Sequence, residues 1–229
     1  MFKNCLVSVS DKSGLVEFLK PWVEKGLRVV STGGTAKHLR DHGIKVIDIS
    51  EQTGFPEVMD GRVKTLHPRV HMALLAREGN QEDASLLKKE GLDPFDLVIV
   101  NLYPFEAALQ KDLTDEEQIE FIDIGGPSML RAAAKNFSRL TIVCDPKDYQ
   151  RLTPKHDVTE ELRRELAGKV FQHTSSYDAM IAKHLLGPQM TEDYGIGGAL
   201  VQTLRYGENP QNNAAWYGQS SDWPFECLQ

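Results

Sequence analysis

Asp123 and Lys135 are side chains of types that can move protons during a reaction. Asp123 precedes a glycine pair, and Lys135 stands at the end of a predicted helix, one turn after Arg131. A carboxylate and a lysine that converge could pass protons between substrate atoms. Because cations also stabilise the last turn of a helix, the pattern alone favours neither interpretation.

A glycine pair marks a candidate anion site in Ser31-Thr32-Gly33-Gly34-Thr35, between a predicted strand and a predicted helix. Glycines allow backbone N–H groups to approach an anion, and a helix N-terminus favours negative charge. The segment matches neither the Walker A pattern nor the dinucleotide pattern, so an ordinary tight turn remains an alternative. Lys12, which follows the first predicted strand in Ser10-Asp11-Lys12, is a candidate phosphate partner or a solvated lysine.

Further cationic and aromatic candidates lie nearby. In Arg62-Val63-Lys64-Thr65, two cationic side chains alternate, and on an extended segment they would face one ligand. The same pattern is common on protein surfaces. Tyr103 follows a buried strand, where it either packs in the core or presents its hydroxyl at the sheet edge. His67 and His71 have metal-ligand spacing, but Pro68 intervenes and no adjoining glutamate completes a zinc motif, so we predict no metal.

Short apolar runs alternate with helical patterns through the first 150 residues, which predicts an α/β fold with a mostly parallel sheet flanked by helices. A long irregular stretch, 50–68, is interpreted as a functional loop. Thr35 is predicted to cap the second helix, and Thr114 with Glu117 forms a predicted capping box. The predicted strands are 5–9, 27–30, 46–49, 97–100 and 140–143, and the predicted helices are 15–23, 35–40, 114–121, 127–137 and 159–185.

Composition excludes several classes of protein. The formal charge of −7 argues against a broad nucleic-acid surface, and no apolar run approaches the roughly 18 residues of a membrane span. Three cysteines lie far apart without a C-x-x-C pair, which is typical of reduced thiols in a cytoplasmic protein. We therefore expect neither nucleic-acid nor membrane partners.

Seven motifs between residues 5 and 186 strongly resemble, in family order, the N-terminal part of the bifunctional AICAR transformylase/IMP cyclohydrolase family. They are 8–12, 31–35, 53–57, 61–68, 101–105, 123–126 and 131–136. The resemblance implies a methylglyoxal-synthase-like α/β domain that closes the second purine ring. Its substrate would be FAICAR (5-formamidoimidazole-4-carboxamide ribotide), and its products IMP and water. No cofactor or metal is implied.

The resemblance also implies roles for individual residues. Lys135 resembles the family's proton donor and acceptor, while Lys64, Tyr103 and Asp123 match positions around the reacting formamide and carboxamide. The implied substrate-binding residues are Ser10, Asp11, Lys12, Thr32, Gly33, Gly34, Thr35, Arg62, Val63, Thr65, Val100, Asn101, Ile124, Gly125, Gly126 and Asn136.

The expected domains are 1–186, the cyclohydrolase domain, and 187–229, a tail without sustained periodicity that is a linker or the start of a missing transformylase domain. Within that tail, Arg205 and Tyr206 match transformylase substrate contacts, but too few residues follow to build a second pocket, so no transformylase activity is expected. The alternative functions are a nucleotide-binding regulatory module and methylglyoxal synthase. A homodimer is left open.

Overall fold

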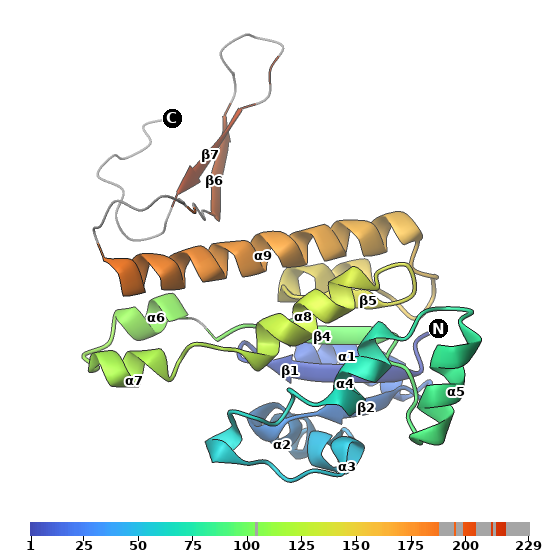
Figure 1. Ribbon diagram of the computed structural model, residues 1–229. Helices are drawn as coiled ribbons and strands as arrows, with labels where there is room; N and C mark the ends of the chain where they lie inside the picture. Colours follow the sequence, from blue (N-terminus) through green and yellow to red (C-terminus); the bar gives the residue numbers. More distant parts are fainter. Residues whose placement is uncertain (104, 188–194, 196–198, 205–211, 213, 219–229) are drawn as a thin grey trace. The chain divides into compact units, whose positions relative to one another are not determined.

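The computed structural model describes residues 1–103, 105–187, 195, 199–204, 212 and 214–218 (Figure 1). Backbone contacts divide the chain into two compact units, Met1–His173 and Thr174–Gln229. The boundary falls inside the long helix α9 (Glu160–Leu186).

The first unit is built on a five-stranded sheet in the order β3-β2-β1-β4-β5, and every neighbouring pair is parallel. This arrangement confirms the predicted parallel sheet. The register places Val7 opposite Ser31 on one side and Ile99 on the other. The strands are β1 (Asn4–Val9), β2 (Arg28–Ser31), β3 (Val46–Asp48), β4 (Leu97–Asn101) and β5 (Thr141–Val143).

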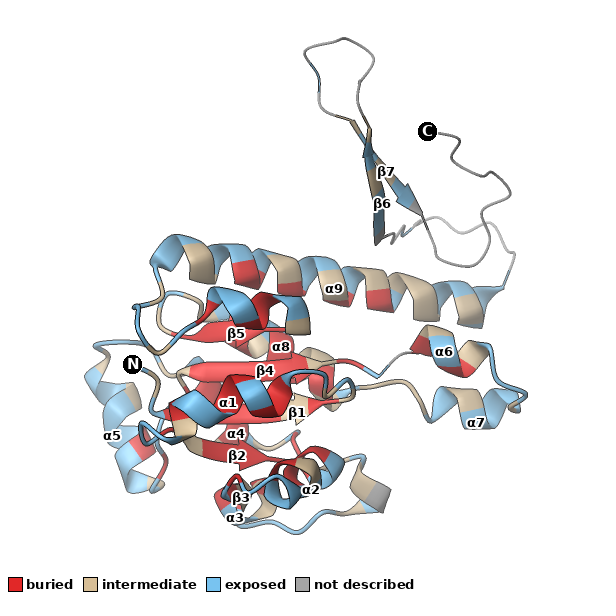
Figure 2. Cartoon of the chain, turned by 180° about the vertical axis from the view of Figure 1, so that it is seen from behind, coloured by how far each residue is buried: buried red, intermediate tan, exposed pale blue. Residues whose placement is uncertain are grey.

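The central strands are apolar throughout because helices cover both faces of the sheet. Leu97 to Val100 are all at most 1% exposed, as the continuous apolar run predicted. Figure 2 shows the strands as the most buried layer of this unit, with exposed residues on the outer sides of the helices. The helices of the first unit before α9 are α1 (Leu15–Val23), α2 (Gly33–Asp41), α3 (Ile49–Thr53), α4 (Pro68–Leu75), α5 (Gln81–Lys89), α6 (Phe105–Leu109), α7 (Asp115–Ile119) and α8 (Gly125–Lys135).

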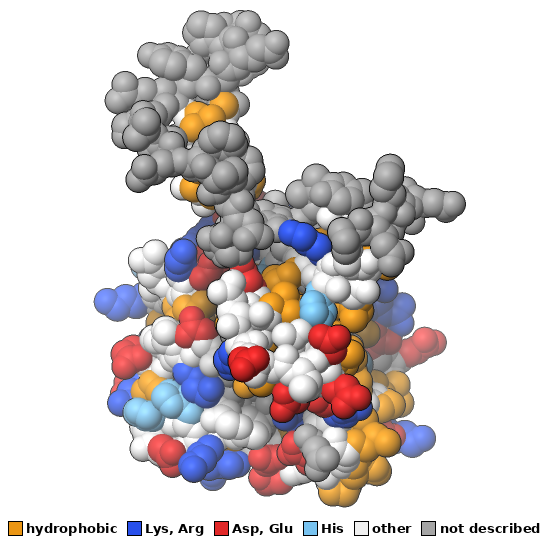
Figure 3. Space-filling model, turned by 90° about the vertical axis from the view of Figure 1, so that its left-hand side faces the viewer, with side chains coloured by type: hydrophobic (Ala, Val, Ile, Leu, Met, Phe, Trp, Pro, Cys, Tyr) orange, Lys and Arg blue, Asp and Glu red, His pale blue; other side chains and the backbone are white. Residues whose placement is uncertain are grey.

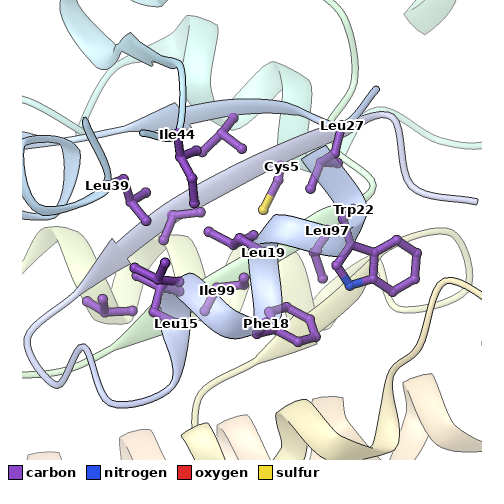
Figure 4. Packing of buried hydrophobic residues seen from close by; sticks show 14 of the residues in the cluster. Cys5, Leu15, Phe18, Leu19, Trp22, Leu27, Leu39, Ile44, Leu97 and Ile99 are labelled. Carbon is purple, nitrogen blue, oxygen red and sulfur yellow. The ribbon is translucent and has the colours of Figure 1, made fainter. Parts of the chain in front are cut away.

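Strand order decides which face each helix covers. The chain moves from β1 to β2 to β3 in one direction and from β4 to β5 in the other, so right-handed crossovers place α1 and α2 on one face and α8 on the opposite face. Accordingly, Leu15 and Leu19 of α1 and Leu39 of α2 share one apolar cluster with Cys5 and Ile99 (Figure 4). Helix α8 instead packs against α4, β4 and β5.

Several local predictions need correction. Helix α2 begins at Gly33 after Thr32, so Thr35 lies inside the helix and does not cap it. The stretch 50–68 is less irregular than predicted, because Asp48 and Glu51 form a capping box that starts α3 at Ile49. A 3-10 helix, η1 (Met59–Gly61), follows. Helices α4, α5 and α6 were not predicted, and a second 3-10 helix, η2 (Pro146–Arg151), follows β5.

Other local predictions are confirmed. Thr114 and Glu117 form the predicted capping box at the start of α7. Helix α8 begins two residues before Pro127, at Gly125, and ends at Lys135. The predicted helix 159–185 forms α9, and Phe171 within it is 42% exposed, with the Arg131 guanidinium over its ring.

The second unit contains two strands that the sequence did not predict. Strands β6 (Ala199–Leu204) and β7 (Ala214–Gly218) pair antiparallel, with Thr203 opposite Ala215. The tail is therefore more than an unstructured linker. Arg205 and Tyr206 lie outside the described residues. Among the helices that are described, none is both long and apolar enough to cross a membrane.

Candidate functional site

The carboxyl ends of β1, β2 and β4 converge at one edge of the sheet. Strand β1 lies between β2 and β4, and the chain reverses its direction of travel across the sheet at the β1–β4 pair. Open α/β sheets bind their ligands outside such a reversal point. The segments that directly follow these three strands carry eight of the predicted site residues: Ser10, Asp11, Lys12, Thr32, Gly33, Gly34, Thr35 and Tyr103.

Asn101, the last residue of β4, holds the loop that follows β1. Its Oδ1 accepts hydrogen bonds from the backbone N–H groups of Ser10 at 2.7 Å and Asp11 at 2.9 Å. Its Nδ2 donates to the Asp11 carbonyl at 2.8 Å. Lys12 Nζ donates to the Ser10 carbonyl at 3.2 Å, and a hydrogen bond from the Ser13 hydroxyl lowers the pKa of Asp11. Asn101 therefore shapes this loop, while Val100 is buried and presents only its backbone.

The N-terminus of α2 forms the candidate anion site. The first N–H groups of a helix have no partner within the helix, and here they belong to Gly33 and Gly34. A Cβ built at Gly34 would meet no atom within 4 Å, so the space beside this turn is open. The Thr35 hydroxyl is not available to a ligand, because it accepts from Val9 N–H at 3.1 Å and donates to the Val9 carbonyl at 3.0 Å. Thr35 instead fixes the turn to β1.

Lys64 reaches this helix end from the segment after η1. Its Nζ lies 3.7 Å from the position that a Cβ of Gly33 would occupy, and 3.5 Å from Glu57 Oε1. The Lys64 ammonium is also close enough to Asp123 to favour the ionised form of that carboxyl group, which acts to lower the pKa of Asp123 against the larger effect of burial. Lys64 thus joins the anion site to a carboxyl group from a distant part of the sequence.

Asp123 lies just before α8 and is largely buried. Its Oδ1 accepts from the Gly126 N–H at 2.7 Å, and the backbone of Tyr103 also hydrogen bonds to the carboxylate. Burial nevertheless dominates and raises the pKa of Asp123, whereas these N–H groups and Lys64 act in the opposite direction. A carboxyl group with a raised pKa holds its proton at a higher pH and is better suited to acid–base catalysis near neutrality.

Two glycines allow other parts of the site to pack against the start of α8. A Cβ at Gly125 would overlap the Thr65 hydroxyl, and a Cβ at Gly126 would overlap the Asp123 carboxylate and approach Leu102 Cδ2 at 2.8 Å. The Gly125-Gly126 pair is therefore required for close approach. It brings Thr65, Asp123 and the end of β4 together.

The remaining predicted residues of this edge differ in their partners. The Arg62 guanidinium pairs with the Glu120 carboxylate, whereas the Lys64 ammonium pairs with Glu57, and contact of both cations with one ligand stays a prediction. Val63 forms an isolated bridge with Val58. Tyr103 is 50% exposed, with its ring 5.4 Å from that of Phe121, which decides against a core role. Ile124 is exposed.

Lys135 and Asn136 lie at the opposite end of α8. Ten residues separate Gly125 from Lys135, which corresponds to about 15 Å along a helix. Lys135 is exposed, and Asn136 Nδ2 donates to the carbonyls of Leu74 at 2.8 Å and Ala76 at 2.9 Å. Within one chain, the structure does not bring these two residues to Lys64 and Asp123.

A pocket of about 430 Å³ extends the same edge toward β5. Ser10, Asp11 and Asn101 line it, together with five residues that the sequence reasoning missed: Cys144, Asp145, Pro146, Lys169 and His173. Cys144, Asp145 and Pro146 could have been predicted, because they follow the carboxyl end of a strand, where open α/β sheets bind ligands. No local sequence signal distinguishes Lys169 and His173 within α9. Lys169 Nζ donates to Asp145 Oδ2 at 2.8 Å and Asp148 Oδ2 at 2.6 Å, while burial lowers the pKa of His173.

His67 and His71, whose spacing is that of a metal-ligand pair, form hydrogen bonds to other residues in this structure. His67 Nδ1 accepts from the Arg69 N–H at 3.2 Å, and His71 Nε2 lies 3.1 Å from Ser128 Oγ. Among the described residues, no group of three His, Cys, Asp or Glu side chains could hold a metal ion.

Comparison with known proteins identifies the family. Residues 14–128, half of the chain, match the family model described as the MGS-like domain. The chain belongs to the MGS-like domain family. Residues 133–227 match a second family model, that of the AICARFT/IMPCHase bienzyme. The MGS-like match contains Gly33, Lys64, Tyr103, Asp123 and Gly125, and therefore the cluster that the fold assembles.

Relatives of this MGS-like chain carry the name bifunctional purine biosynthesis protein PurH. The protein of this name from Bacillus subtilis strain 168 is 50% identical over 223 residues, and that from Bacillus mycoides strain KBAB4 is 49% identical over 225 residues. The alignments cover 94% and 95% of this chain but only 44% of each relative, so the chain spans less than half of their length.

A solved structure described as the crystal structure of ForH also resembles this chain. It shares 35% identity at a TM-score of 0.71, over 80% of this chain and 96% of that one. Most of this chain thus shares its fold with an experimental structure.

The surface of the MGS-like chain carries charges of both signs. On the face shown in Figure 3, acidic and basic side chains alternate with hydrophobic ones, without a broad basic area. This distribution agrees with the net charge of −7.

Proposed function

We propose that this chain is an IMP cyclohydrolase that converts FAICAR to IMP and water. The observation that carries the proposal is the cluster of Lys64, Asp123 and the α2 N-terminus, assembled from three separate segments at the ligand-binding edge of the sheet. The similarity to proteins named bifunctional purine biosynthesis protein PurH supports the substrate class.

The ribotide phosphate would bind at the N-terminus of α2. The N–H groups of Gly33 and Gly34 and the helix dipole favour an anion there, and Lys12 adds positive charge from the neighbouring loop. The base would then extend toward Asn101, Tyr103 and Asp123. This orientation follows from the order of these residues along the sheet edge.

Ring closure requires a proton to leave the carboxamide nitrogen while that nitrogen attacks the formyl carbon. Negative charge develops on the formyl oxygen, where the Lys64 ammonium and the Tyr103 hydroxyl would stabilise it. Asp123 would accept one proton of the carboxamide nitrogen and deliver it to the formyl oxygen, so that the C–N bond closes the ring and the oxygen becomes a hydroxyl group. The formamide nitrogen then loses its proton and forms a C=N bond as the C–O bond breaks, and that proton leaves with the hydroxyl group as water. Because both reacting groups belong to one molecule, binding them in contact supplies a large part of the acceleration.

The domain expectation becomes part of this proposal: residues 1–186 form the catalytic domain, while 187–229 contribute little to cyclisation. We do not expect AICAR transformylase activity from these residues, which align with only 44% of the bifunctional relatives. A cytoplasmic location and a homodimer remain predictions, as does the resemblance-based role of Lys135 in proton transfer.

A nucleotide-binding regulatory module is the second candidate function. An anion site at the α2 N-terminus would serve a sensor equally well. The specific observation against it is the largely buried Asp123 carboxyl beside the Lys64 ammonium, an arrangement that mere binding of a phosphate does not need.

The direct test is incubation of the purified chain with FAICAR while IMP formation is measured. We expect multiple turnovers without added metal or cofactor. Tight binding of IMP with no turnover would replace the cyclohydrolase by the regulatory module.

A further inference from the structure

Glu57 lies opposite Lys64 across a short loop. Val58 and Val63 form an antiparallel bridge, and the 3-10 turn η1 closes the loop between them. Glu57 and Lys64 directly flank this bridge, and Lys64 Nζ lies 3.5 Å from Glu57 Oε1. The loop therefore brings a carboxylate to the ammonium group that the proposed reaction needs.

Gly61 shows how closely the loop packs around this ion pair. Its φ of +87° lies in the left-handed region that favours glycine. In addition, a Cβ at this position would overlap the Glu57 carboxylate and lie 3.3 Å from Lys64 Nζ. Backbone conformation and space both require glycine here, and the space is occupied by the two charged groups.

The electrostatic surroundings of Lys64 explain why a carboxylate is useful at this point. The ammonium lies beside Gly33, the first residue of α2, where the helix dipole favours an anion and disfavours a cation. Glu57 provides compensating negative charge from the other side. Both side chains are partly exposed, 33% for Lys64 and 49% for Glu57, so the pair is weak enough to adjust when a ligand enters.

We propose that Glu57 is a positioning residue for Lys64, an inference that rests on the proposed cyclohydrolase function. The Glu57 carboxylate competes with the bound phosphate for the neighbouring ammonium group, so that Lys64 remains available to the formyl oxygen. The phosphate is then bound by the α2 N–H groups and Lys12. Without Glu57, the phosphate becomes the strongest negative charge near Lys64, and the ammonium turns toward it.

The Glu57→Gln variant tests this role because it preserves the side chain's shape and removes its charge. We expect kcat for IMP formation to fall about tenfold, while KM for FAICAR stays unchanged or decreases. Calorimetric titration with IMP should show unchanged or tighter binding, since Lys64 is free to contact the phosphate. Glu57→Asp, which retains the charge, should recover part of the lost kcat.

Glu160→Gln is the matched control, since Glu160 also forms an exposed ion pair, with Arg164 in the first turns of α9, and neither residue lines the pocket at the sheet edge. It should leave kcat and KM unchanged. Wild-type turnover with an unchanged kcat in Glu57→Gln would overturn the positioning role alone. A rise in KM together with weaker IMP binding would also overturn it, because Glu57 would then only maintain the loop. Absence of turnover in the wild type would instead refute the proposed function itself.

Discussion

The two ends of helix α8 differ in burial and in their hydrogen-bond partners, although the motifs 123–126 and 131–136 are close together in the sequence. At the N-terminal end, Asp123 is largely buried, accepts the Gly126 N–H, and lies near Lys64. At the C-terminal end, Lys135 is exposed and Asn136 binds backbone carbonyls near the end of α4. About 15 Å of helix separates the ends, so two neighbouring motifs contribute to different parts of the molecule.

Asp123→Asn should produce the largest loss, because it removes the acid–base group at the N-terminal end of α8. We expect kcat for IMP formation to fall by on the order of 10²–10⁴. Steady-state kinetics on the folded variant measures the change. Retention of more than about a tenth of the wild-type kcat would show that proton transfer does not depend on this end of the helix.

Lys64→Met should reduce kcat by roughly 10²-fold, since it removes one preorganised donor to the developing oxyanion. The effect should fall on kcat more than on KM if the contact strengthens in the transition state. An effect confined to KM would make Lys64 a phosphate ligand. That result would link it to the α2 terminus and separate it from Asp123.

Gly34→Val should weaken IMP binding about tenfold, because a side chain would enter the space beside the α2 N–H groups. A Cβ at Gly34 meets nothing within 4 Å, so the melting temperature should change little. Gly168→Val in α9, also without neighbours within 4 Å, is the control for valine in a helix. Calorimetry that finds the same IMP affinity in Gly34→Val and wild type would make the glycine turn purely structural.

Lys135→Met separates two predictions about the C-terminal end of α8. Its resemblance-based role in proton transfer predicts that kcat falls by at least about tenfold, whereas the roughly 15 Å of helix between the two ends of α8 predicts a smaller loss. A loss of kcat of tenfold or more in the folded variant would show that both ends of α8 contribute to the reaction. It would show that the C-terminal end of α8 reaches a reaction centre by an arrangement outside a single copy of the chain.

The smallest effect concerns the pH dependence of stability. Burial raises the folded-state pKa of Asp123 above its unfolded value, so the folded state binds the proton more tightly. The resulting stabilisation is complete below the unfolded pKa of about 4 and is lost as the pH rises through the folded pKa. Asp123→Asn has no titrating group at this position, so its free energy of unfolding should rise relative to that of the wild type as the pH increases from about 4 to about 7. Chemical denaturation of both proteins at the two pH values measures it; a constant difference would contradict the raised pKa.

The general architecture was predictable because its signals are local. Continuous apolar runs such as Leu97 to Val100 indicate strands covered on both faces, and the Thr114–Glu117 capping box marks a helix start by residue type alone. The predicted N-cap of α2 was wrong, because two threonines near the helix start were both suited to the cap position. Thr35 resembles a cap, but its hydroxyl bonds to β1 while Thr32 occupies the cap position.

From the sequence we could predict the parallel α/β class, the glycine turn after β2 and the candidate residues at the strand ends, since each depends on neighbours within one or two turns of chain. The position of Lys64 beside Gly33, Glu57 and Asp123, and the distance of Lys135 from them, could be read only from the folded chain. The physical reason is that proximity between distant segments follows from strand order and helix length, and the order β3-β2-β1-β4-β5 brings the loops after β1, β2 and β4 together at one edge.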